Sequence, residues 1–355
     1  MPRCLLVLGA CVLWAQTPSA ETFTVSPDGG GDYPTIQAAV FAAEAGDVIF
    51  LADGTFTGDG NRDVNFQGRA ITVRSASGDP ETCVIECEGS ASAHHRAFVF
   101  QTEEDEASVI EGITIRGGYH GWGGAIFCGP DERPEIRGCV FRANRASSFG
   151  GAIYCGPGAS PQILSCIFQD NEADAFGGAL YGDGGSDPLI ETSILSRNSG
   201  PHGGALFFRG ANPMLDRCTL TGNGADYGGG IYCNDKATVL VNQSIIAFGS
   251  AGEAVYDDGL STATLTGCDV HGNAGGDWVG AIDGQDETGG NLAVDPQFCS
   301  PEPDDHQNWR LQSDSPCVSE AIGACGAGCG ISPARSSTWS AIKARFSSPP
   351  EGSRP

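Results

Sequence analysis

The amino-acid sequence predicts an all-β protein, a parallel β-helix built from stacked coils of about 25 residues each. Three observations lead to this prediction. The six residues GGAIFC at Gly123–Cys128 return in similar form four more times, at intervals of 25 to 27 residues. A second signature, which ends in asparagine, recurs inside most of these repeats. The apolar runs between the signatures are short, alternate with polar residues and end in Gly, Pro, Asn or Asp, which is typical of strands joined by turns.

The Gly-Gly signature is predicted to mark a corner of each coil. It returns as GGAIYC, GGALYG, GGALFF and GGGIYC, which begin at Gly150, Gly177, Gly203 and Gly228. Glycine tolerates backbone angles and close approaches that a Cβ atom would forbid. The repetition therefore indicates that every coil turns the same tight corner.

The asparagine of the second signature is predicted to form a ladder along the stack. Stacked coils bring equivalent side chains to within about one strand spacing, ~4.8 Å, where amides can hydrogen-bond to one another. Asparagine also tolerates left-handed backbone angles, so we expect it to occupy a sharp corner itself. The equivalent residues are Asn144, Asn171, Asn198, Asn223 and Asn273.

The two ends of the β-helix need separate elements, because an open stack exposes unpaired strand edges. Residues 34–44 carry apolar side chains at helical spacing and are predicted to cap the first coil. The β-helix is predicted over residues 21–278, and a Cys-rich C-terminal cap over residues 279–330. Residues 331–355 are predicted to be disordered, apart from the segment Trp339–Phe346, which has one apolar helical face and is either a docking or sorting tag or a frayed tail.

The first twenty residues predict export. Arg3, a short apolar run and Ser19-Ala20 have the layout of a secretory signal peptide over residues 1–20. A lipoprotein signal with Cys11 as the lipidated residue is the alternative, but the apolar run continues beyond Cys11. No later segment holds the roughly twenty apolar residues of a transmembrane helix. We therefore expect a secreted protein, extracellular or at the cell surface.

The charge of the chain excludes one class of partner. With 44 acidic and 19 basic residues, the net charge is −25. Such a surface repels nucleic acid and anionic lipid, so nucleic-acid binding is not expected. An acidic polysaccharide would need a divalent cation to bridge it to the protein. Ca²⁺ is the only cofactor that we consider.

Two parts of the sequence resemble known families. The stretches VSPDGGGDYPTIQAAV at residues 25–40 and GDVIFLADGTF at residues 46–56 resemble the opening of pectinesterase- and pectate-lyase-like proteins. The GGA[IL] and FxxN signatures are similar to repeats of chlamydial polymorphic outer-membrane proteins, which are surface adhesins. The resemblance covers residues 22–278 and implies a right-handed parallel β-helix of the pectin-lyase-like superfamily. The catalytic Asp pair and downstream Arg of pectinesterases have no counterpart here.

One aromatic column is the candidate glycan-binding surface. Period-2 alternation places Ile126 and Cys128 inward, so the residue between them faces outward. An exposed row of rings offers flat faces for stacking on sugars. The alternative is that the strand kinks and the rings stack inside the core. The column consists of Phe127, Tyr154, Tyr181, Phe207, Tyr232 and Tyr256.

A polar column beside the rings contains the candidate catalytic and metal-binding residues. The resemblance to pectate-lyase-like enzymes implies Ca²⁺ held by Asp183, Asp257 and Asp258, with Arg209 or Lys236 as the base. The alternative is a solvated acidic surface without chemistry. Two functions therefore remain open: a glycan-binding or adhesive protein without catalysis, and a Ca²⁺-dependent polysaccharide lyase or hydrolase. A purely structural exoprotein is a third.

The cysteines have a structural interpretation. Cys128 with Cys155, and Cys139 with Cys166, occupy equivalent positions on adjacent coils. Disulfides between coils are one prediction for these pairs. Reduced thiols packed in the core are the other.

Overall fold

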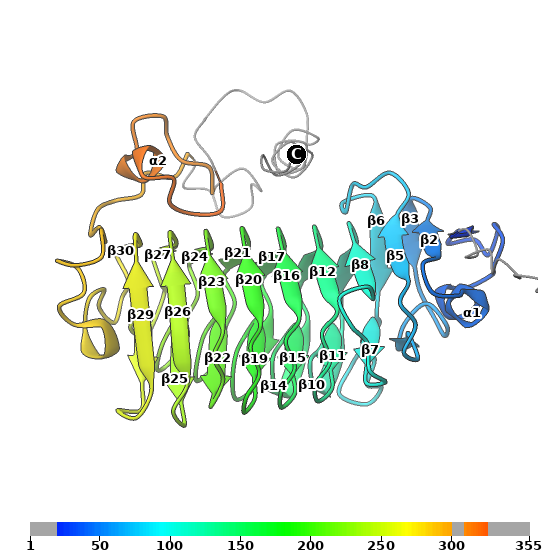
Figure 1. Cartoon of the computed structure of the whole chain (residues 1–355), viewed down its shortest axis with the longest axis horizontal. Helices are drawn as coiled ribbons and strands as arrows, with labels where there is room; N and C mark the ends of the chain where they lie inside the picture. The colour runs from blue at the N-terminus through cyan, green and yellow to red at the C-terminus, as the bar shows by residue number, and fades with distance from the viewer. Residues whose placement is uncertain (1–19, 300–308, 326–355) are drawn as a thin grey trace, which may run out of the picture.

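The computed structural model describes residues 20–299 and 309–325. The predicted signal peptide, apart from Ala20, and the tail predicted over residues 331–355, with its Trp339–Phe346 segment, lie outside these residues. The predicted parallel β-helix is confirmed: the chain winds through three long parallel sheets of ten, nine and eight strands (Figure 1). Each strand pairs in register with its equivalent one coil away, as Ile126 does with Ile153.

The strands follow one another in each sheet in spatial order. The ten-stranded sheet consists of β1 (Thr22–Val25), β2 (Val48–Leu51), β5 (Thr72–Ser75), β8 (Val109–Glu111), β12 (Glu135–Arg137), β16 (Gln162–Leu164), β20 (Leu189–Glu191), β23 (Met214–Asp216), β26 (Thr238–Asn242) and β29 (Thr262–Thr266). The nine-stranded sheet consists of β3 (Gly54–Phe56), β6 (Cys83–Glu86), β9 (Thr114–Arg116), β13 (Val140–Arg142), β17 (Ile167–Gln169), β21 (Ile194–Ser196), β24 (Thr219–Thr221), β27 (Ile245–Ala247) and β30 (Asp269–His271). The eight-stranded sheet consists of β4 (Val64–Asn65), β7 (Phe98–Phe100), β11 (Ile126–Cys128), β15 (Ile153–Cys155), β19 (Leu180–Gly182), β22 (Leu206–Arg209), β25 (Ile231–Asn234) and β28 (Val255–Asp257).

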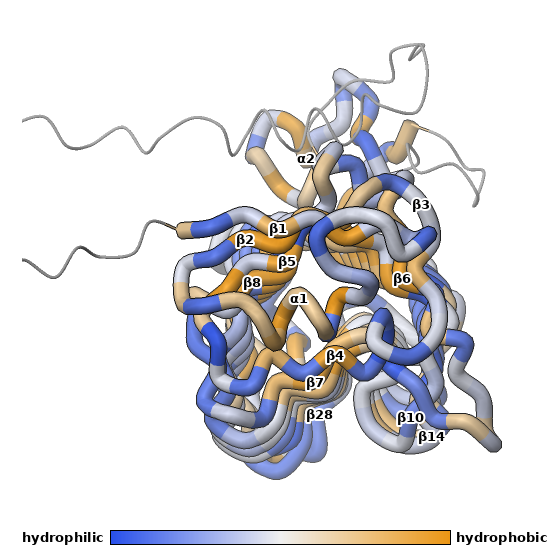
Figure 2. Tube along the Cα trace, turned by 90° about the vertical axis from the view of Figure 1, so that its right-hand side faces the viewer, coloured by the Kyte–Doolittle hydropathy of each residue, from blue (hydrophilic) through white to orange (hydrophobic). Residues whose placement is uncertain are grey.

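A small fourth sheet belongs to the loops between the nine- and eight-stranded sheets. It consists of β10 (Tyr119–Trp122), β14 (Arg145–Phe149) and β18 (Glu172–Ala173). Viewed along the long axis, these loops form a lobe beside the main coils (Figure 2). Each loop ends at a Gly-Gly pair, where the chain enters the eight-stranded sheet.

The Gly-Gly pairs are the tight corners that the sequence predicts. Gly123 has a left-handed φ of 61°, a conformation that favours glycine. A Cβ atom on the next residue, Gly124, would collide with the carbonyl oxygen of Gly151 on the neighbouring coil. The first glycine therefore supplies the turn, and the second lets adjacent backbones approach.

The asparagines form a hydrogen-bonded ladder over four consecutive coils. The side-chain amide of Asn144 donates to Asn171 Oδ1 (3.1 Å), Asn171 donates to Asn198 (2.9 Å), and Asn198 donates to Asn223 (3.0 Å). The ladder stops there, because Gly249 occupies the next position, and Asn273 instead donates to Asp277 Oδ1 (2.8 Å).

The prediction that these asparagines adopt left-handed angles is wrong. The left-handed residue is the one before each asparagine, as at Ala143 (φ 52°), Asp170 (φ 56°) and Arg197 (φ 52°). The asparagine contributes its side chain, which also donates to a backbone carbonyl, for example from Asn171 to Phe141 O (3.0 Å). Its amide therefore ties the corner to the next coil.

The predicted N-terminal helix is present as α1 (Ile36–Ala42). Thr35 begins it, since the Thr35 hydroxyl accepts the Ala38 N–H (3.2 Å), and the helix buries Ile36, Ala39 and Val40. Figure 2 shows α1 within the outline of the coils in the view along the long axis. Its role as a cap of the first coil stays a prediction.

The C-terminal elements lie in two places. The short 3₁₀ helix η1 (Gly280–Ile282) packs against β28 and β29 at the end of the stack. Residues 309–325, with helix α2 (Pro316–Ser319), lie along the outer face of the nine-stranded sheet (Figure 1). There they cover outward-facing aliphatic side chains of successive strands, among them Val140, Ile167, Ile194 and Ile245.

The predicted disulfides Cys128–Cys155 and Cys139–Cys166 do not form; all four residues are buried thiols. In-register neighbours keep their Cβ atoms about one strand spacing, ~4.8 Å, apart. A disulfide needs them at about 3.5–4.5 Å. The alternative of packed core thiols therefore describes these residues. In the described part of the chain, no helix has the length and apolar character needed to cross a bilayer.

Candidate functional site

The predicted aromatic column projects from the outer face of the eight-stranded sheet. Ile126 and Cys128 belong to the central core, whereas the rings form a separate cluster outside the coils. Successive rings of the column, from Phe127 to Tyr256, have centroids 4.8 to 5.6 Å apart. The outward direction inferred from alternation is therefore the one that the structure has.

A second aromatic column, missed in the sequence analysis, covers the middle of the first. Its members each stand directly before a Gly-Gly pair, a position that could have revealed them. Phe149 lies 4.8 Å from Tyr181, and Phe176 lies 4.7 Å from Phe207, between ring centroids. This outer column consists of Trp122, Phe149, Phe176, His202 and Tyr227.

The covering leaves little of the inner column open to a ligand. Tyr154, Tyr181 and Phe207 are buried, and Tyr181 is only 2% exposed. Phe127, Tyr232 and Tyr256, which lie toward the two ends, are half-buried. The role of the six rings as a glycan-stacking surface stays a prediction, and the three central rings offer no free face for it.

The candidate base Arg209 is engaged with a candidate metal ligand. Its guanidinium forms a salt bridge with Asp183 (3.2 Å), and the other oxygen of Asp183 accepts the Tyr154 hydroxyl (3.0 Å). Burial, together with the charge of Asp183, raises the pKa of Tyr181 to about 12. Lys236, the other candidate base, is exposed.

The three candidate metal ligands do not lie together. Asp183 and Asp258 hold equivalent positions three coils apart, which corresponds to about 14 Å. The Asp258 carboxylate accepts backbone N–H groups of Asp235, Leu260 and Ser261 and so stabilises a turn. In residues 20–299 and 309–325, no three His, Cys, Asp or Glu side chains lie close enough to hold a metal ion.

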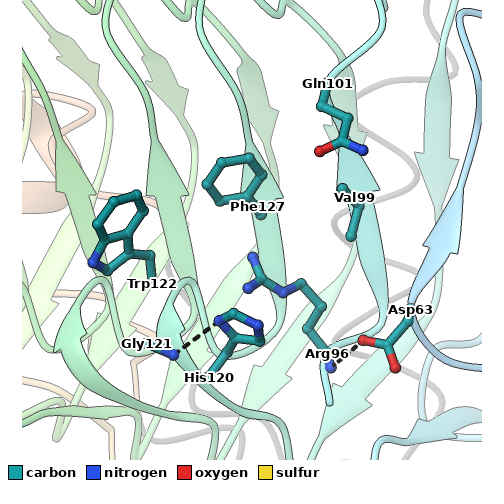
Figure 3. A pocket seen from close by; sticks show the side chains of 8 residues that line it. All are labelled: Asp63, Arg96, Val99, Gln101, His120, Gly121, Trp122 and Phe127. Carbon is teal, nitrogen blue, oxygen red and sulfur yellow. Dashed lines mark hydrogen bonds between the residues drawn. The ribbon is translucent and has the colours of Figure 1, made fainter. Parts of the chain in front are cut away.

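A groove at the N-terminal end of the aromatic columns brings together a different set of residues (Figure 3). Its volume is about 570 Å³. It lies between β7, β10 and β11, and Val99 and Phe127 form its floor as register partners on adjacent strands. We call it the Trp122 groove; it is lined by Asp63, Arg96, Val99, Gln101, His120, Gly121, Trp122 and Phe127.

Arg96 is the buried cation of this groove. It is only 5% exposed, and its guanidinium carbon lies 5.1 Å from the centre of the Phe127 ring. Burial lowers the pKa of Arg96 to about 10, so the side chain remains charged at neutral pH. Asp63 is nearby, but its carboxylate is bonded to His95 Nδ1 (2.7 Å) and to the Arg96 backbone N–H (3.1 Å).

His120 adds a neutral donor. Burial and the charge of Arg96 lower the pKa of His120 to about 4, so the imidazole is uncharged at neutral pH. Its Nδ1 accepts the Gly121 N–H (2.8 Å), which leaves the ring proton on Nε2 (Figure 3). The groove therefore offers N–H donors from both His120 and Arg96.

Trp122 forms the aromatic wall of the groove. The indole is 46% exposed and stacks against Tyr154 and Phe149, at centroid distances of 5.4 and 6.1 Å. The inner and outer columns therefore support one face of the indole from behind. Among the aromatic residues of both columns, Trp122 and Tyr227 are the most exposed.

Two buried carboxyl groups, Glu104 and Glu132, fix the backbone at Gln101, which lines the groove across from Trp122. Glu104 accepts the backbone N–H groups of Gln101 and Thr102 (2.8 and 2.7 Å). Glu132, one coil further on, accepts the Glu104 N–H. Burial and the neighbouring Glu104 raise the pKa of Glu132 to about 7. The position of Gln101 thus depends on a pair of buried acids.

Comparison with known proteins bears on the fold. Residues 125–285 match a family model described as a right-handed beta helix region. No curated protein matches the chain with significance. A solved rhamnogalacturonan lyase is similar at 12% identity, with 87% of this chain and 100% of that chain covered and a TM-score of 0.46.

Two further solved structures are similar at a lower level. The pectate lyase Pel9A has 13% identity, coverage of 88% of this chain and 97% of that chain, and a TM-score of 0.39. A pectin methylesterase from Aspergillus niger has 14% identity, coverage of 78% and 95%, and a TM-score of 0.27. Likenesses at this level carry no information about activity or substrate.

Proposed function

We propose that this right-handed parallel β-helix protein is a secreted or surface-associated protein that binds carbohydrate without cleaving it, in the Trp122 groove. The observation that carries the proposal is the half-exposed indole of Trp122, which is stacked from behind by Tyr154 and Phe149. Export is expected from the signal peptide predicted over residues 1–20.

The groove has the two kinds of contact that a sugar needs. One flat aromatic wall can pack against the C–H face of a pyranose ring, with the indole already fixed by its neighbours. Side chains with polar atoms, Arg96, Gln101 and His120, line the same groove and can bond to hydroxyl groups. Because the wall is held in place before binding, little side-chain entropy is lost when the ligand arrives.

Binding to a glycan array, followed by calorimetry on the glycans that bind, tests this function. Trp122→Ala should weaken binding by about tenfold, which corresponds to about 1.4 kcal/mol and to the loss of roughly 50–60 Å² of apolar contact between the indole and the C–H face of the sugar. Tyr227→Ala is the matched control: Tyr227 belongs to the same column and is also 46% exposed, but it does not line the groove. Equal affinities for wild type and Trp122→Ala would exclude the groove as the carbohydrate site.

The alternative, a Ca²⁺-dependent lyase or hydrolase, is tested in the same samples. Incubation of the bound polysaccharide with and without Ca²⁺ should leave its chain length unchanged. Unsaturated products that disappear in Arg209→Ala would establish the lyase instead. The separation of Asp183 from Asp257 and Asp258 supports the non-catalytic function.

A further inference from the structure

We infer that the Trp122 groove binds an anionic group at Arg96, so that the carbohydrate it selects carries a carboxylate or a sulfate ester. The identity of the ligand as a carbohydrate rests on the proposed function. The anion site itself rests on Arg96 and its surroundings, and it can be tested without any sugar.

Arg96 is placed unlike most arginines of the chain. A buried guanidinium is costly unless a carboxylate pairs with it. Within residues 20–299 and 309–325, Arg96 forms no salt bridge, and its guanidinium carbon lies 5.1 Å from the centre of the Phe127 ring. Most other arginines, though more exposed, do form salt bridges: Arg62, Arg74, Arg116, Arg137, Arg142, Arg145, Arg197, Arg209 and Arg217.

The nearby carboxylate of Asp63 attracts the guanidinium, which raises the pKa of Arg96 against the effect of burial, but no salt bridge joins the two side chains. Asp63 lines the same groove, but its two oxygens accept His95 Nδ1 and the Arg96 backbone N–H. The guanidinium lies between the side chains of Phe127 and His120, and Arg96 lines the groove together with both (Figure 3). A bound anion would form the salt bridge that Arg96 lacks, and the guanidinium would take the place of the bridging cation that the net charge of −25 otherwise requires for an acidic ligand.

The other groups near Arg96 favour the same class of ligand. His120 is neutral and carries its proton on Nε2, so it can donate a hydrogen bond to an anion or to a hydroxyl group. Trp122 is placed to stack on the ring that carries the anion. Guanidinium and carboxylate or sulfate form short, charge-assisted hydrogen bonds, often in pairs, which makes Arg the side chain suited to this role.

The full chain titrated with three probes tests the inference. The probes are sodium glucuronate, a sugar with a carboxylate; inorganic sulfate, an anion without a sugar; and methyl glucoside, a neutral sugar. The Arg96 Nε–H resonance in ¹H–¹⁵N NMR reports binding in the wild type directly, with sodium chloride at equal ionic strength as the reference. Glucuronate and sulfate should shift this resonance saturably.

Variants separate the contribution of Arg96, which contacts the anion, from that of Trp122, which contacts the sugar ring. Arg96→Gln should weaken glucuronate and sulfate binding by about tenfold or more, as expected for loss of a charge-assisted pair. Arg145→Gln, which removes an equally charged residue on the neighbouring loop sheet, should have no effect. Trp122→Ala should weaken glucuronate and leave sulfate binding unchanged.

Each result separates the anion site from carbohydrate binding. If only methyl glucoside binds, with dependence on Trp122, the carbohydrate function stands and the anion site is wrong. If sulfate binds with dependence on Arg96 but no sugar binds, the anion site stands and the carbohydrate function is wrong. An unchanged Arg96 resonance with every anion overturns the inference even if Arg96→Gln fails to fold.

Discussion

Trp122 lies face to face with Tyr154, with ring centroids 5.4 Å apart and planes inclined by 26°. This contact joins the outer aromatic column to the inner one. It also connects the wall of the groove to a ring that is buried and anchored, because the Tyr154 hydroxyl donates to Asp183. The orientation of the indole is therefore set by residues that a ligand does not touch.

Tyr154 should act as a positioning residue for Trp122. Tyr154→Leu removes stacking on Phe127, Trp122 and Tyr181, so it should lower the free energy of unfolding by about 1–3 kcal/mol and weaken glycan binding. Tyr154→Phe keeps the ring and loses only the bond to Asp183, which should cost about 1 kcal/mol and leave affinity intact. Denaturant unfolding and calorimetry distinguish the two. Equal binding by wild type and Tyr154→Leu would contradict the positioning role.

The asparagine ladder should be a main source of stability. Asn171→Ala leaves three groups without their partner: the backbone and side-chain N–H of Asn144, and the carbonyl of Phe141. Because each buried unsatisfied polar group costs about 1–3 kcal/mol, the free energy of unfolding should fall by about 3 kcal/mol or more.

Asn212→Ala provides the control for the ladder. Asn212 is exposed and donates to Asp187 at the surface, so its loss should change stability by less than about 1 kcal/mol. Urea unfolding of both variants gives the comparison. Similar midpoints for the two variants would show that the ladder contributes little.

Stability should fall as the pH rises through the range in which Glu132 loses its proton. The pKa of Glu132 is raised from 4.5 to about 7 in the folded protein, so the folded state favours the protonated acid. Its contribution is fully present below pH 4.5 and is lost between pH 4.5 and about 7. Glu132→Gln should flatten this part of the profile.

Asp131→Asn is the control for Glu132. Asp131 is the exposed neighbour and has a left-handed φ of 64°, which asparagine also tolerates. Thermal unfolding from pH 4 to 8 should give parallel profiles for this variant and the wild type. A profile that stays steep in Glu132→Gln would assign the pH dependence to another group.

The pKa of His120 should respond to Arg96. Burial and the guanidinium both hold this pKa at about 4, below the ordinary 6.5. Arg96→Gln removes the second cause, so the pKa of His120 should rise toward 6.5 while remaining below it. NMR titration of the histidine ring protons measures the shift, with His202, several coils away, as the internal reference. No shift in the variant would mean that the two side chains do not interact.

The sequence predicts the coils well because each coil repeats the same local chemistry. The left-handed angle at Gly123, the inward Ile126 and the stacked Asn171 all follow from spacing and residue type. The course of the loops does not follow in this way. Whether Phe149 turns back over Tyr181 depends on contacts between coils, which alternation within one strand does not encode.

The Trp122 groove is harder to predict for a related reason. Arg96 precedes a coil in which neither repeat signature is present, so no register places it beside Phe127. The pairing of Asp63 with His95, 32 positions apart, is likewise a product of the fold. The one available signal was local: Trp122 begins the series of aromatic residues that stand before the Gly-Gly pairs.

Residues 309–325 give the stack a mechanical reinforcement. In a stack of coils, each coil contacts only its two neighbours. The weakest interface between two coils therefore sets the force along the axis at which the stack comes apart. The asparagine ladder ends at Asn223, because Gly249 occupies the next position, so no side-chain amide joins the coils of β24 and β27. At that joint, Ala324 N–H bonds to Thr219 Oγ1 (3.0 Å) on one coil, and Gly323 N–H bonds to Gln243 O (2.8 Å) on the next. The segment therefore bridges the two coils on the outside of the stack. A force applied along the long axis must break both of these hydrogen bonds before the two coils can separate.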